Sequence, residues 1–381
     1  MKGKYSLLFL VSLFSLASCG NVEVSKAEFI FEDFSVDFHT DFQNTYFIDK
    51  TFDEIYSDIY YGKAEKPVRG TDYSAPKGID ISWSVKTDKG SLSSYKVYVS
   101  EKEDLSDAIE IKAKKKSANF NNVKMNTTYY YKITSGRFES EVNSFTTTSK
   151  GPRNLYVDGV RNVRDLGGYG YIKQGLVYRG GAFESFQKNS DVVVTNITNN
   201  GIKTIQNEFK IKTEIDLRKN KSSSGKPENC DLIESTISGV NYVSLPMVYE
   251  NHSILEYVTD DYNDPARVKD FFDILADETN YPVYFHCEYG KDRTGNLAYV
   301  LEALLGMDNE ALFRDYLFSN FGSILDYNLT PTGITGNVGK TLDDYLRGEE
   351  LSLAEKTYRY LNEEIGVSQE NLDSVIDILK V

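Results

Sequence analysis

Short runs of alternating polar and apolar residues, separated by turns, mark the chain between about residues 66 and 149. Such runs cover residues 81–85, 95–99, 109–111 and 128–133. Alternation with a period of two is typical of strands that bury one face. Several short strands at turn-separated intervals predict a small all-β sandwich over residues 66–149.

A tyrosine-rich run lies at residues 123–133 in this β region. It resembles the fibronectin type III strand that carries the tyrosine corner, with Tyr129 as the corner residue. Tyr129, Tyr131 and Ile133 share one face at period two, so we expect them in the core. Hydrophobic positions carry this resemblance, and no group in the region suggests a reaction centre. The predicted sandwich is therefore a spacer or a binding module.

The pattern changes after the linker at residues 146–152, which is rich in small residues and ends in Gly-Pro. Residues 211–217 and 282–285 read as buried strands. Leu297, Val300, Leu301 and Leu304 have the spacing of one helix face. Strands that alternate with helices predict an α/β domain with a central sheet over residues 150–381. The whole chain is thus predicted to be multidomain, a β-sandwich followed by an α/β domain.

The far end of the chain is predicted to be helical. Residues 352–355 form a capping box, and Leu372, Val375, Ile376 and Leu379 form a closing amphipathic face. These helices are interpreted as scaffold.

The first residues have the features of a targeting segment. A basic start is followed by an apolar run at residues 5–17, too short to span a bilayer but typical of a signal peptide. The run ends in a sequence that resembles the bacterial lipobox, which implies cleavage after residue 18 and a lipid on Cys19. Residues 19–65, which are acidic and aromatic, are interpreted as a spacer. The expected location is the bacterial cell envelope, outside the cytoplasm, with the lipid holding the protein to a membrane. Gly20 mildly favours an outer membrane, because the aspartate that signals inner-membrane retention in some bacteria is absent there.

The charge of the chain excludes one class of partner. The formal net charge is −14 over 381 residues, and the longest basic stretch is the short run at residues 112–116. Nucleic acid is therefore a poor partner, because its phosphates require a basic surface. The basic run is interpreted as a solvated strand or hairpin edge.

The three cysteines are Cys19, Cys230 and Cys287, which is too few for a disulfide framework. Cys230 is interpreted as a plain thiol. A second hypothesis gives it a reversible disulfide with Cys287 that protects Cys287 from over-oxidation.

The strongest chemical signal lies at residues 286–294. A predicted strand runs into His286 and Cys287, five residues follow, and Arg293 and Thr294 open a predicted helix. Strand, loop and helix in this order form a site for a phosphate group, because the backbone N–H groups and the helix N-terminus converge on the anion. The residues expected to bind phosphate are Glu288, Tyr289, Gly290, Lys291, Asp292 and Arg293.

Cys287 is the predicted nucleophile. It must be a thiolate to attack phosphorus, and the N–H groups, the helix dipole and Arg293 are expected to lower its pKa. Arg293 offers a planar fork that can bind two phosphate oxygens and stabilise the charge during transfer. His286 is expected to orient the loop, and the Thr294 hydroxyl to stabilise the departing thiolate.

The leaving oxygen needs a proton, and two carboxylic acids are candidates for its donor. Asp292 lies inside the loop, beside Arg293, and resembles the loop aspartate of myotubularin-type phosphatases. Asp216 lies at a strand end and could reach the same pocket. Each has a structural alternative: Asp292 could hold Arg293 in place, and Asp216 could form an ion pair with Arg218.

Four motifs in order resemble the bacterial tyrosine phosphatase family, a branch of the dual-specificity and lipid phosphatases. They lie at residues 161–169, 177–182, 215–218 and 286–295. The resemblance spans the whole predicted α/β domain. It implies hydrolysis of phosphotyrosine, and sometimes of phosphoserine, phosphothreonine or phosphoinositides, with no metal and no other cofactor.

The substrate class is left open by three residues of the loop. Glu288 and Tyr289 stand where the family usually has a small or neutral residue followed by Ala, and a similar Glu occurs in cysteine-type phytases. Lys291 favours more highly charged ligands. The leading hypothesis is a lipid-anchored phosphatase acting on phosphorylated protein or a small phosphate ester. The alternatives are a phosphoinositide or inositol phosphate phosphatase, and a catalytically silent surface-binding lipoprotein.

Overall fold

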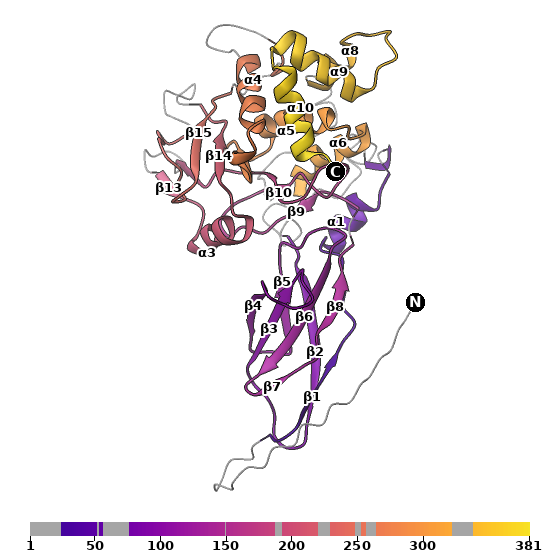
Figure 1. Ribbon diagram of the computed structural model, residues 1–381, viewed down its shortest axis with the longest axis vertical. Coiled ribbons are helices and arrows are strands. Elements are labelled where there is room, and N and C mark those ends of the chain that lie inside the picture. Colours follow the sequence, from indigo (N-terminus) through magenta and orange to yellow (C-terminus); the bar gives the residue numbers. More distant parts are fainter. Residues whose placement is uncertain are drawn as a thin grey trace. The chain divides into compact units, whose positions relative to one another are not determined.

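The computed structural model describes residues 24–51, 53–55, 76–148, 150–186, 193–219, 229–247, 253–256, 264–321 and 338–381. The predicted signal peptide and Cys19 lie outside these residues. The described residues form two compact units (Figure 1). Residues 24–38 and 77–148 make the first, and the described part of 39–76 with 150–381 makes the second. Within the described ranges, no helix is both long and apolar enough to cross a bilayer.

The first unit contains two antiparallel sheets. The three-stranded sheet has the order β1-β2-β5, and the other has the order β4-β3-β6-β7, with β8 also paired to β6. The strands are β1 (Ala27–Phe31), β2 (Ile79–Thr87), β3 (Tyr95–Ser100), β4 (Ile109–Ala113), β5 (Ser117–Phe120), β6 (Thr128–Ser135), β7 (Phe138–Glu139) and β8 (Asn143–Thr146). The predicted strands of this region are confirmed, and β1 extends the unit toward the N-terminus.

Aromatic side chains from both sheets meet in the core of this unit. Trp83 of β2 contacts Tyr95 of β3 edge to face at 5.3 Å, and Phe31 of β1 contacts Tyr131 of β6 in the same way at 5.2 Å. Strand β6 alternates between buried and less buried positions, so that its inner face turns to the core. The predicted burial of Tyr129, Tyr131 and Ile133 is confirmed.

Tyr129 also makes the contact expected of a corner tyrosine. Its hydroxyl accepts a hydrogen bond from the backbone N–H of Lys124 at 2.8 Å. This bond ties the start of β6 to the loop that precedes it. The wider likeness to fibronectin type III domains stays a prediction.

The second unit is built on a six-stranded mixed sheet with the order β15-β14-β16-β11-β10-β9. The four neighbouring strands β15, β14, β16 and β11 are parallel, while β10 is antiparallel to both β11 and β9. The strands are β9 (Arg153–Asn154), β10 (Arg164–Asp165), β11 (Val177–Gly180), β14 (Thr213–Asp216), β15 (Asn241–Ser244) and β16 (Val283–His286). A separate hairpin joins β12 (Glu184–Phe186) and β13 (Val193–Thr195). The predicted α/β domain with a central sheet is thus confirmed.

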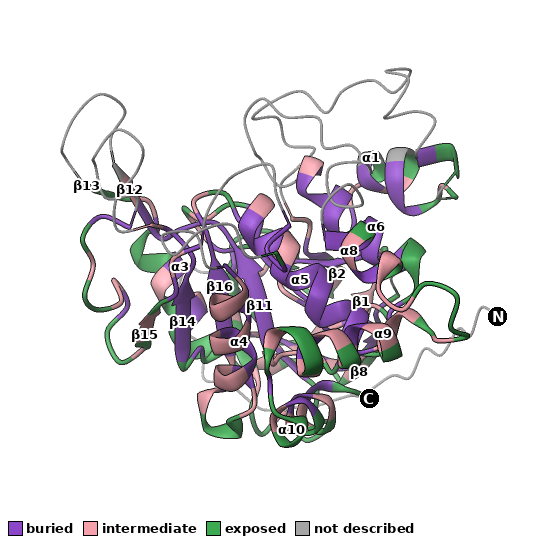
Figure 2. Cartoon of the chain, turned by 90° about the horizontal axis from the view of Figure 1, so that it is seen from above, coloured by how far each residue is buried: buried purple, intermediate pink, exposed green. Residues whose placement is uncertain are grey.

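Helices cover both faces of this sheet, because successive side chains of β16 point to opposite faces and are buried on both. Val283 and Phe285 belong to the larger apolar cluster, with side chains of four helices: α4 (Asp264–Leu275), α5 (Asp292–Leu304), α6 (Asn309–Phe318) and α10 (Gln369–Leu379). Tyr284 belongs to the other apolar cluster, where it joins Ile205 and Phe209 of η3 (Thr204–Phe209). Figure 2 shows β11, β16 and α5 as buried elements in the middle of this unit. The central strand is therefore fixed from both sides.

The helices of the second unit begin and end as follows. They are α1 (Asp41–Gln43), η1 (Asn44–Ile48), α3 (Asn199–Lys203), η3 (Thr204–Phe209), α4 (Asp264–Leu275), η4 (Glu278–Asn280), α5 (Asp292–Leu304), α6 (Asn309–Phe318), η5 (Ser319–Phe321), α8 (Lys340–Asp344), α9 (Leu353–Tyr360), η7 (Leu361–Ile365) and α10 (Gln369–Leu379). The predicted capping box at the start of α9 is confirmed, since Ser352 and Glu355 exchange hydrogen bonds with each other's backbone. Leu372, Val375 and Leu379 of α10 are buried, as predicted.

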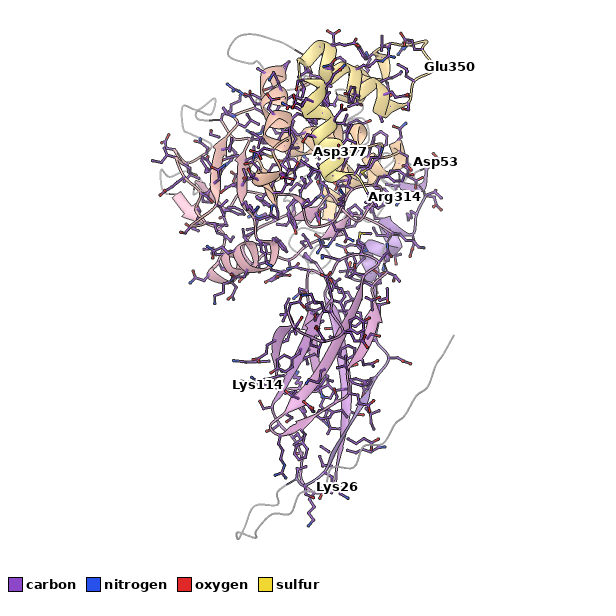
Figure 3. The ribbon with its side chains drawn as sticks, in the orientation of Figure 1. Lys26, Asp53, Lys114, Arg314, Glu350 and Asp377 are labelled. Carbon is purple, nitrogen blue, oxygen red and sulfur yellow. The ribbon has the colours of Figure 1, made fainter. Side chains whose placement is uncertain are left out.

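The predicted spacer at residues 19–65 is divided between the two units. Its described residues up to 38 include β1, whereas residues from His39 onward pack on the second unit. Phe47 contacts Phe318 of α6 at 5.8 Å, and its carbonyl accepts a hydrogen bond from Arg314 Nη1 at 3.1 Å. Arg314 is labelled in Figure 3. The domain boundaries therefore differ from the predicted ones, because the apolar side chains of this segment find partners in both units.

Candidate active site

Three of the sequence motifs converge where the parallel strands end. β16 lies between β11 and β14, and His286 at its end is in register with Gly180 on one side and Asp216 on the other. Carboxyl ends of parallel strands meet at one edge of a sheet, which is where ligands bind in open α/β folds. The chain leaves β16 at Cys287, forms a short loop and enters α5 at Asp292.

The loop closes tightly around Gly290. Its φ angle is +65°, which favours glycine. A Cβ atom at this position would also lie 2.2 Å from the carbonyl carbon of Gly180. The sequence motifs at 177–182 and 286–294 therefore fit each other by backbone contact.

The backbone carbonyl groups of the loop accept hydrogen bonds from residues outside the loop. Asn162 Nδ2 donates to the carbonyls of Tyr289 at 3.1 Å and Gly290 at 3.0 Å. Arg179 Nη2 also donates to the Gly290 carbonyl, at 2.9 Å. The Glu288 carbonyl accepts from the backbone N–H of Ala182 at 3.2 Å.

The backbone N–H groups of the same loop are the groups that could bind an anion. In the described part of the chain, no acceptor faces the backbone N–H groups of Glu288 and Gly290. The N-terminus of α5 follows directly, with the positive end of its dipole at the loop. Backbone donors at a helix N-terminus form a phosphate-binding site.

Cys287 lies at the base of this loop and is 4% exposed. Burial raises the pKa of its thiol, but Arg293 and the side chain and backbone N–H of Thr294 outweigh burial, and the pKa falls below its ordinary value. The thiolate is the reactive form of cysteine. The site therefore favours the nucleophile in its active state.

Arg293 stands in the first turn of α5 and is 7% exposed. Its Nη1 lies 3.4 Å from the carbonyl of Leu217, one residue past β14. The guanidinium is thus held at the carboxyl edge of the sheet, close enough to Cys287 to lower its pKa. This is the placement expected of a group that binds phosphate oxygens.

His286 is fully buried behind the loop. Its Nε2 lies 2.9 Å from Oε1 of Glu214, and its Nδ1 lies 3.9 Å from Oδ1 of Asp216. Burial lowers the pKa of His286, but the two carboxylates outweigh it and raise the pKa to about 9. Nδ1 also lies 3.2 Å from the Cys287 carbonyl, which fits the predicted orienting role.

Asp216 is held in a buried ion pair. Arg218 donates to it from Nε at 2.9 Å and from Nη2 at 2.7 Å, and the hydroxyl of Tyr242 donates at 3.0 Å. Burial raises the pKa of Asp216, but His286 and Arg218 together lower it by more, so the net shift is downward. A general acid must hold a proton, so these contacts favour the ion-pair interpretation over proton donation.

Asp292 has the opposite character. Burial raises the pKa of its carboxyl, and Lys291, whose Nζ lies 3.6 Å from Oδ1, lowers it only in part. Its side chain keeps 28% of its surface exposed. A partly accessible carboxyl with a raised pKa in the loop itself suits a proton donor.

The remaining side chains of the loop differ in charge and exposure. Lys291 is 6% exposed, whereas Tyr289 is 40% exposed. Burial raises the pKa of Glu288, and its Oε2 lies 3.6 Å from Nη1 of Arg218. The loop therefore carries both an acidic and a basic side chain.

Cys230 lies in a buried turn near Arg218, Glu184 and Glu288. Burial raises its pKa to about 11, so its thiol is a weak nucleophile. Cys230 and Cys287 are both unbridged in this structure. The hypothesis of a reversible disulfide between them stays untested.

Several residues that shape the site were missed by the sequence analysis. Glu214, Glu184 and Asp315 are buried carboxylates that bind His286, Arg218 and the two arginines of the upstream motifs. Glu214 and Glu184 could have been noticed, since each is an acid in or beside an apolar strand. Asp315 lies in a helix with no local signal. In the described ranges, no cluster of acidic, histidine or cysteine side chains is arranged to hold a metal ion.

A cysteine directly after a central parallel strand, a short loop, and an arginine at the start of the following helix are the features expected of a cysteine-dependent phosphatase. The chain belongs to the tyrosine phosphatase family, whose sequence model matches residues 155–380.

Comparison with other proteins adds little beyond the family. No curated protein matches the sequence. Among solved structures, the catalytic domain of the PP-IP phosphatase SIW14 from S. cerevisiae, in complex with citrate, is 15% identical, with 46% of this chain and 88% of that chain covered and a TM-score of 0.28. TpbA from P. aeruginosa, in complex with pTyr, is also 15% identical, with 56% and 96% covered and a TM-score of 0.32.

Proposed function

We propose that the protein hydrolyses phosphate monoesters, chiefly phosphotyrosine in proteins, through a cysteinyl-phosphate on Cys287. One observation carries the proposal: a buried thiol whose pKa is lowered by Arg293 and Thr294, at the start of a loop that leads directly into the N-terminus of α5. A lowered thiol pKa has no structural use in a buried position, where burial alone would raise it. It fits a nucleophile held ready for attack.

The reaction proceeds in two steps. In the first, Cys287 Sγ attacks phosphorus, the bond from phosphorus to the ester oxygen breaks, and Asp292 gives its proton to that oxygen. In the second, water attacks phosphorus, the bond from sulfur to phosphorus breaks, and the water proton passes to the Asp292 carboxylate. Arg293 and the loop N–H groups hold the phosphoryl oxygens in both steps. Inorganic phosphate leaves, and Cys287 and Asp292 return to their initial states.

An aromatic substrate is supported by Tyr289. This side chain belongs to the loop and is well exposed, so it offers an aromatic surface next to the bound phosphate. Aromatic rings pack favourably edge to face or with an offset. Phosphotyrosine would contact Tyr289 with its ring while the loop holds its phosphate.

A second substrate class is supported by Lys291. This ammonium group is nearly buried in the loop, and its Nζ lies 3.6 Å from Oδ1 of Asp292. Additional positive charge favours ligands that carry more than one phosphate. Phosphoinositides or inositol phosphates are therefore the alternative substrates.

A substrate panel tests the proposal. Purified protein is given phosphotyrosine, phosphoserine and phosphothreonine peptides, phosphoinositides and inositol phosphates, and released phosphate is measured. We expect the highest kcat/KM on phosphotyrosine peptides, and no release by Cys287→Ser. Equal, negligible release by both proteins on every substrate would instead favour the catalytically silent binding protein.

The N-terminal sequence supports a proposal for the location. We infer that Cys19 carries a lipid after signal peptide cleavage and anchors the protein outside the cytoplasm of a bacterium. The test is membrane fractionation with mass spectrometry of the N-terminal peptide. A Cys19→Ala protein is expected in the soluble fraction. An unmodified Cys19 in the membrane-associated protein would contradict the anchor.

A further inference from the structure

Asp315 in α6 holds two buried arginines with one carboxylate. Arg164 Nε donates to Oδ1 at 2.8 Å, and Arg179 Nη1 donates to Oδ2. Arg164 Nη2 also donates to the backbone carbonyl of Asp315 at 2.9 Å. Both guanidinium groups are completely buried, so each depends on its protein contacts.

The same two arginines reach the catalytic loop. Arg179 donates to the Gly290 carbonyl directly. Arg164 donates to Asn162 Oδ1 through Nη1, and Asn162 donates through Nδ2 to the carbonyls of Tyr289 and Gly290. Two hydrogen-bonded paths therefore run from Asp315 to the loop, one through Arg179 and one through Arg164 and Asn162.

The charges around Asp315 show why it cannot be replaced by a neighbour. Burial lowers the pKa of Arg164 to about 10, and Asp315 raises it in opposition. Glu302 of α5 is another buried carboxyl near these arginines, but burial and Asp315 raise its pKa well above the usual value. Burial raises the pKa of Asp315, whereas Arg164 and Arg179 lower it to below normal. Asp315 is thus the acid whose pKa these arginines lower, and its carboxylate makes the direct contacts with both of them.

We propose that Asp315 is a positioning residue for the reaction, and this rests on the proposed function. Its carboxylate fixes both guanidinium groups, which hold the carbonyls of Tyr289 and Gly290 away from the pocket and so turn the loop N–H groups toward phosphate. Without that carboxylate, Arg164 and Arg179 repel each other and the Gly290 carbonyl is released. A carbonyl that turns inward repels the anion and the Cys287 thiolate.

The inference is tested in the full chain with Asp315→Asn, using two measurements that need no turnover. The first is the dissociation constant of orthovanadate. The second is the pH dependence of Cys287 alkylation by iodoacetamide. We expect vanadate affinity to fall by roughly 10²-fold, comparable to the loss of a preorganised donor, and the alkylation midpoint to move toward that of an ordinary thiol.

A matched control separates positioning from loss of stability. Asp308 caps α6 by accepting from the Ala311 N–H at 2.8 Å and contacts neither arginine in the described structure. Asp308→Ala is expected to weaken the same helix and to leave vanadate affinity and the alkylation midpoint unchanged. An Asp315→Asn protein that keeps both wild-type values overturns the inference.

A second variant decides the matter if Asp315→Asn does not fold. Arg179→Lys keeps the positive charge near Asp315, but one ammonium group cannot span the carboxylate and the Gly290 carbonyl as the guanidinium does. It is expected to show the same two losses, and unchanged values contradict the inference. Failure of the proposed function would look different: wild-type protein would bind vanadate but release no phosphate from any ester.

Discussion

His286 Nε2 and Glu214 Oε1 lie 2.9 Å apart, and both side chains are fully buried. Glu214 and Asp216 keep the imidazole charged to about pH 9, against an ordinary value of 6.5. A positive charge thus stands directly behind the catalytic loop throughout the neutral range.

Because the pKa of His286 is raised on folding, its charge stabilises the second unit fully below pH 6.5, and this stabilisation is lost as pH rises through about 9. At about 1.4 kcal/mol per pH unit, we expect a loss on the order of 3 kcal/mol. Calorimetric unfolding across this range measures it. His286→Asn should be less stable at pH 6 and show a flatter profile, and a wild-type profile without a fall in this window would refute the prediction.

The rate of phosphate release should have a bell-shaped pH dependence. Activity needs the Cys287 thiolate, whose pKa is lowered, and the protonated Asp292, whose pKa is raised. The rising limb of kcat/KM therefore lies below the pKa of an ordinary thiol, and the falling limb above that of an ordinary aspartate. Asp292→Asn is expected to remove the falling limb. A falling limb that persists in this variant would exclude Asp292 as the titrating acid.

The two candidate acids can be separated by leaving groups. Asp292→Asn is expected to lose about 10² to 10⁴ in rate on an alkyl phosphate with a poor leaving group, and little on para-nitrophenyl phosphate. Asp216→Asn should lower both rates by a similar factor, because it disturbs the ion pair with Arg218 and the partner of His286. Single-turnover rates on the two esters measure the difference. The reverse pattern would make Asp216 the donor.

Glu288 is expected to limit the charge of the substrate. Its carboxyl lies at the loop, 3.6 Å from Nη1 of Arg218, and its ionised form repels additional phosphate groups. Glu288→Gln should raise kcat/KM on inositol polyphosphates several-fold relative to a phosphotyrosine peptide. Lys291→Gln, at the same loop, should shift the ratio the other way. Equal ratios in all three proteins would show that the loop charge does not select the substrate.

The hydrogen bond of Tyr129 should stabilise the first unit. Tyr129→Phe leaves the Lys124 N–H without its acceptor, which costs about 1 to 3 kcal/mol. Trp83 is the only tryptophan of the chain and is buried in this unit, so its fluorescence reports urea unfolding. Tyr98→Phe is the control, because the Tyr98 hydroxyl donates to the exposed Glu110 across the strands. An unfolding midpoint equal to wild type in Tyr129→Phe would contradict the role of this bond.

The sequence predicts the catalytic loop well because its signal is local. The strand before Cys287, the loop and the helix after Arg293 occupy neighbouring residues, and their order follows from period and residue type. The strands of the first unit are predictable for the same reason. The ion pair of Asp216 with Arg218 was also open to prediction, since only one residue lies between the partners.

Contacts between distant residues were beyond the sequence. Asp315 binds an arginine 151 positions earlier in the chain, and nothing in the pattern of α6 distinguishes it from a surface aspartate. The division of residues 19–65 was hidden likewise, because Phe47 has apolar neighbours only in the folded chain. The acidic and aromatic residues of this segment are compatible with a strand or with one face of a helix, and only the packing partner in the folded chain decides between them.

The order of the two units along the chain has a practical consequence for dissecting the protein. A fragment that starts at residue 150 would keep the family region and Cys287, yet it would leave Phe318 and Arg314 without Phe47. A fragment that ends before 150 would carry that detached aromatic segment as exposed surface. Residues 77–148 lie between two pieces of the catalytic unit, and residues 24–38 belong with them in the first unit, because β1 pairs with β2. A catalytic fragment that respects both cores therefore starts at residue 39, omits residues 77–148 and joins the flanking pieces.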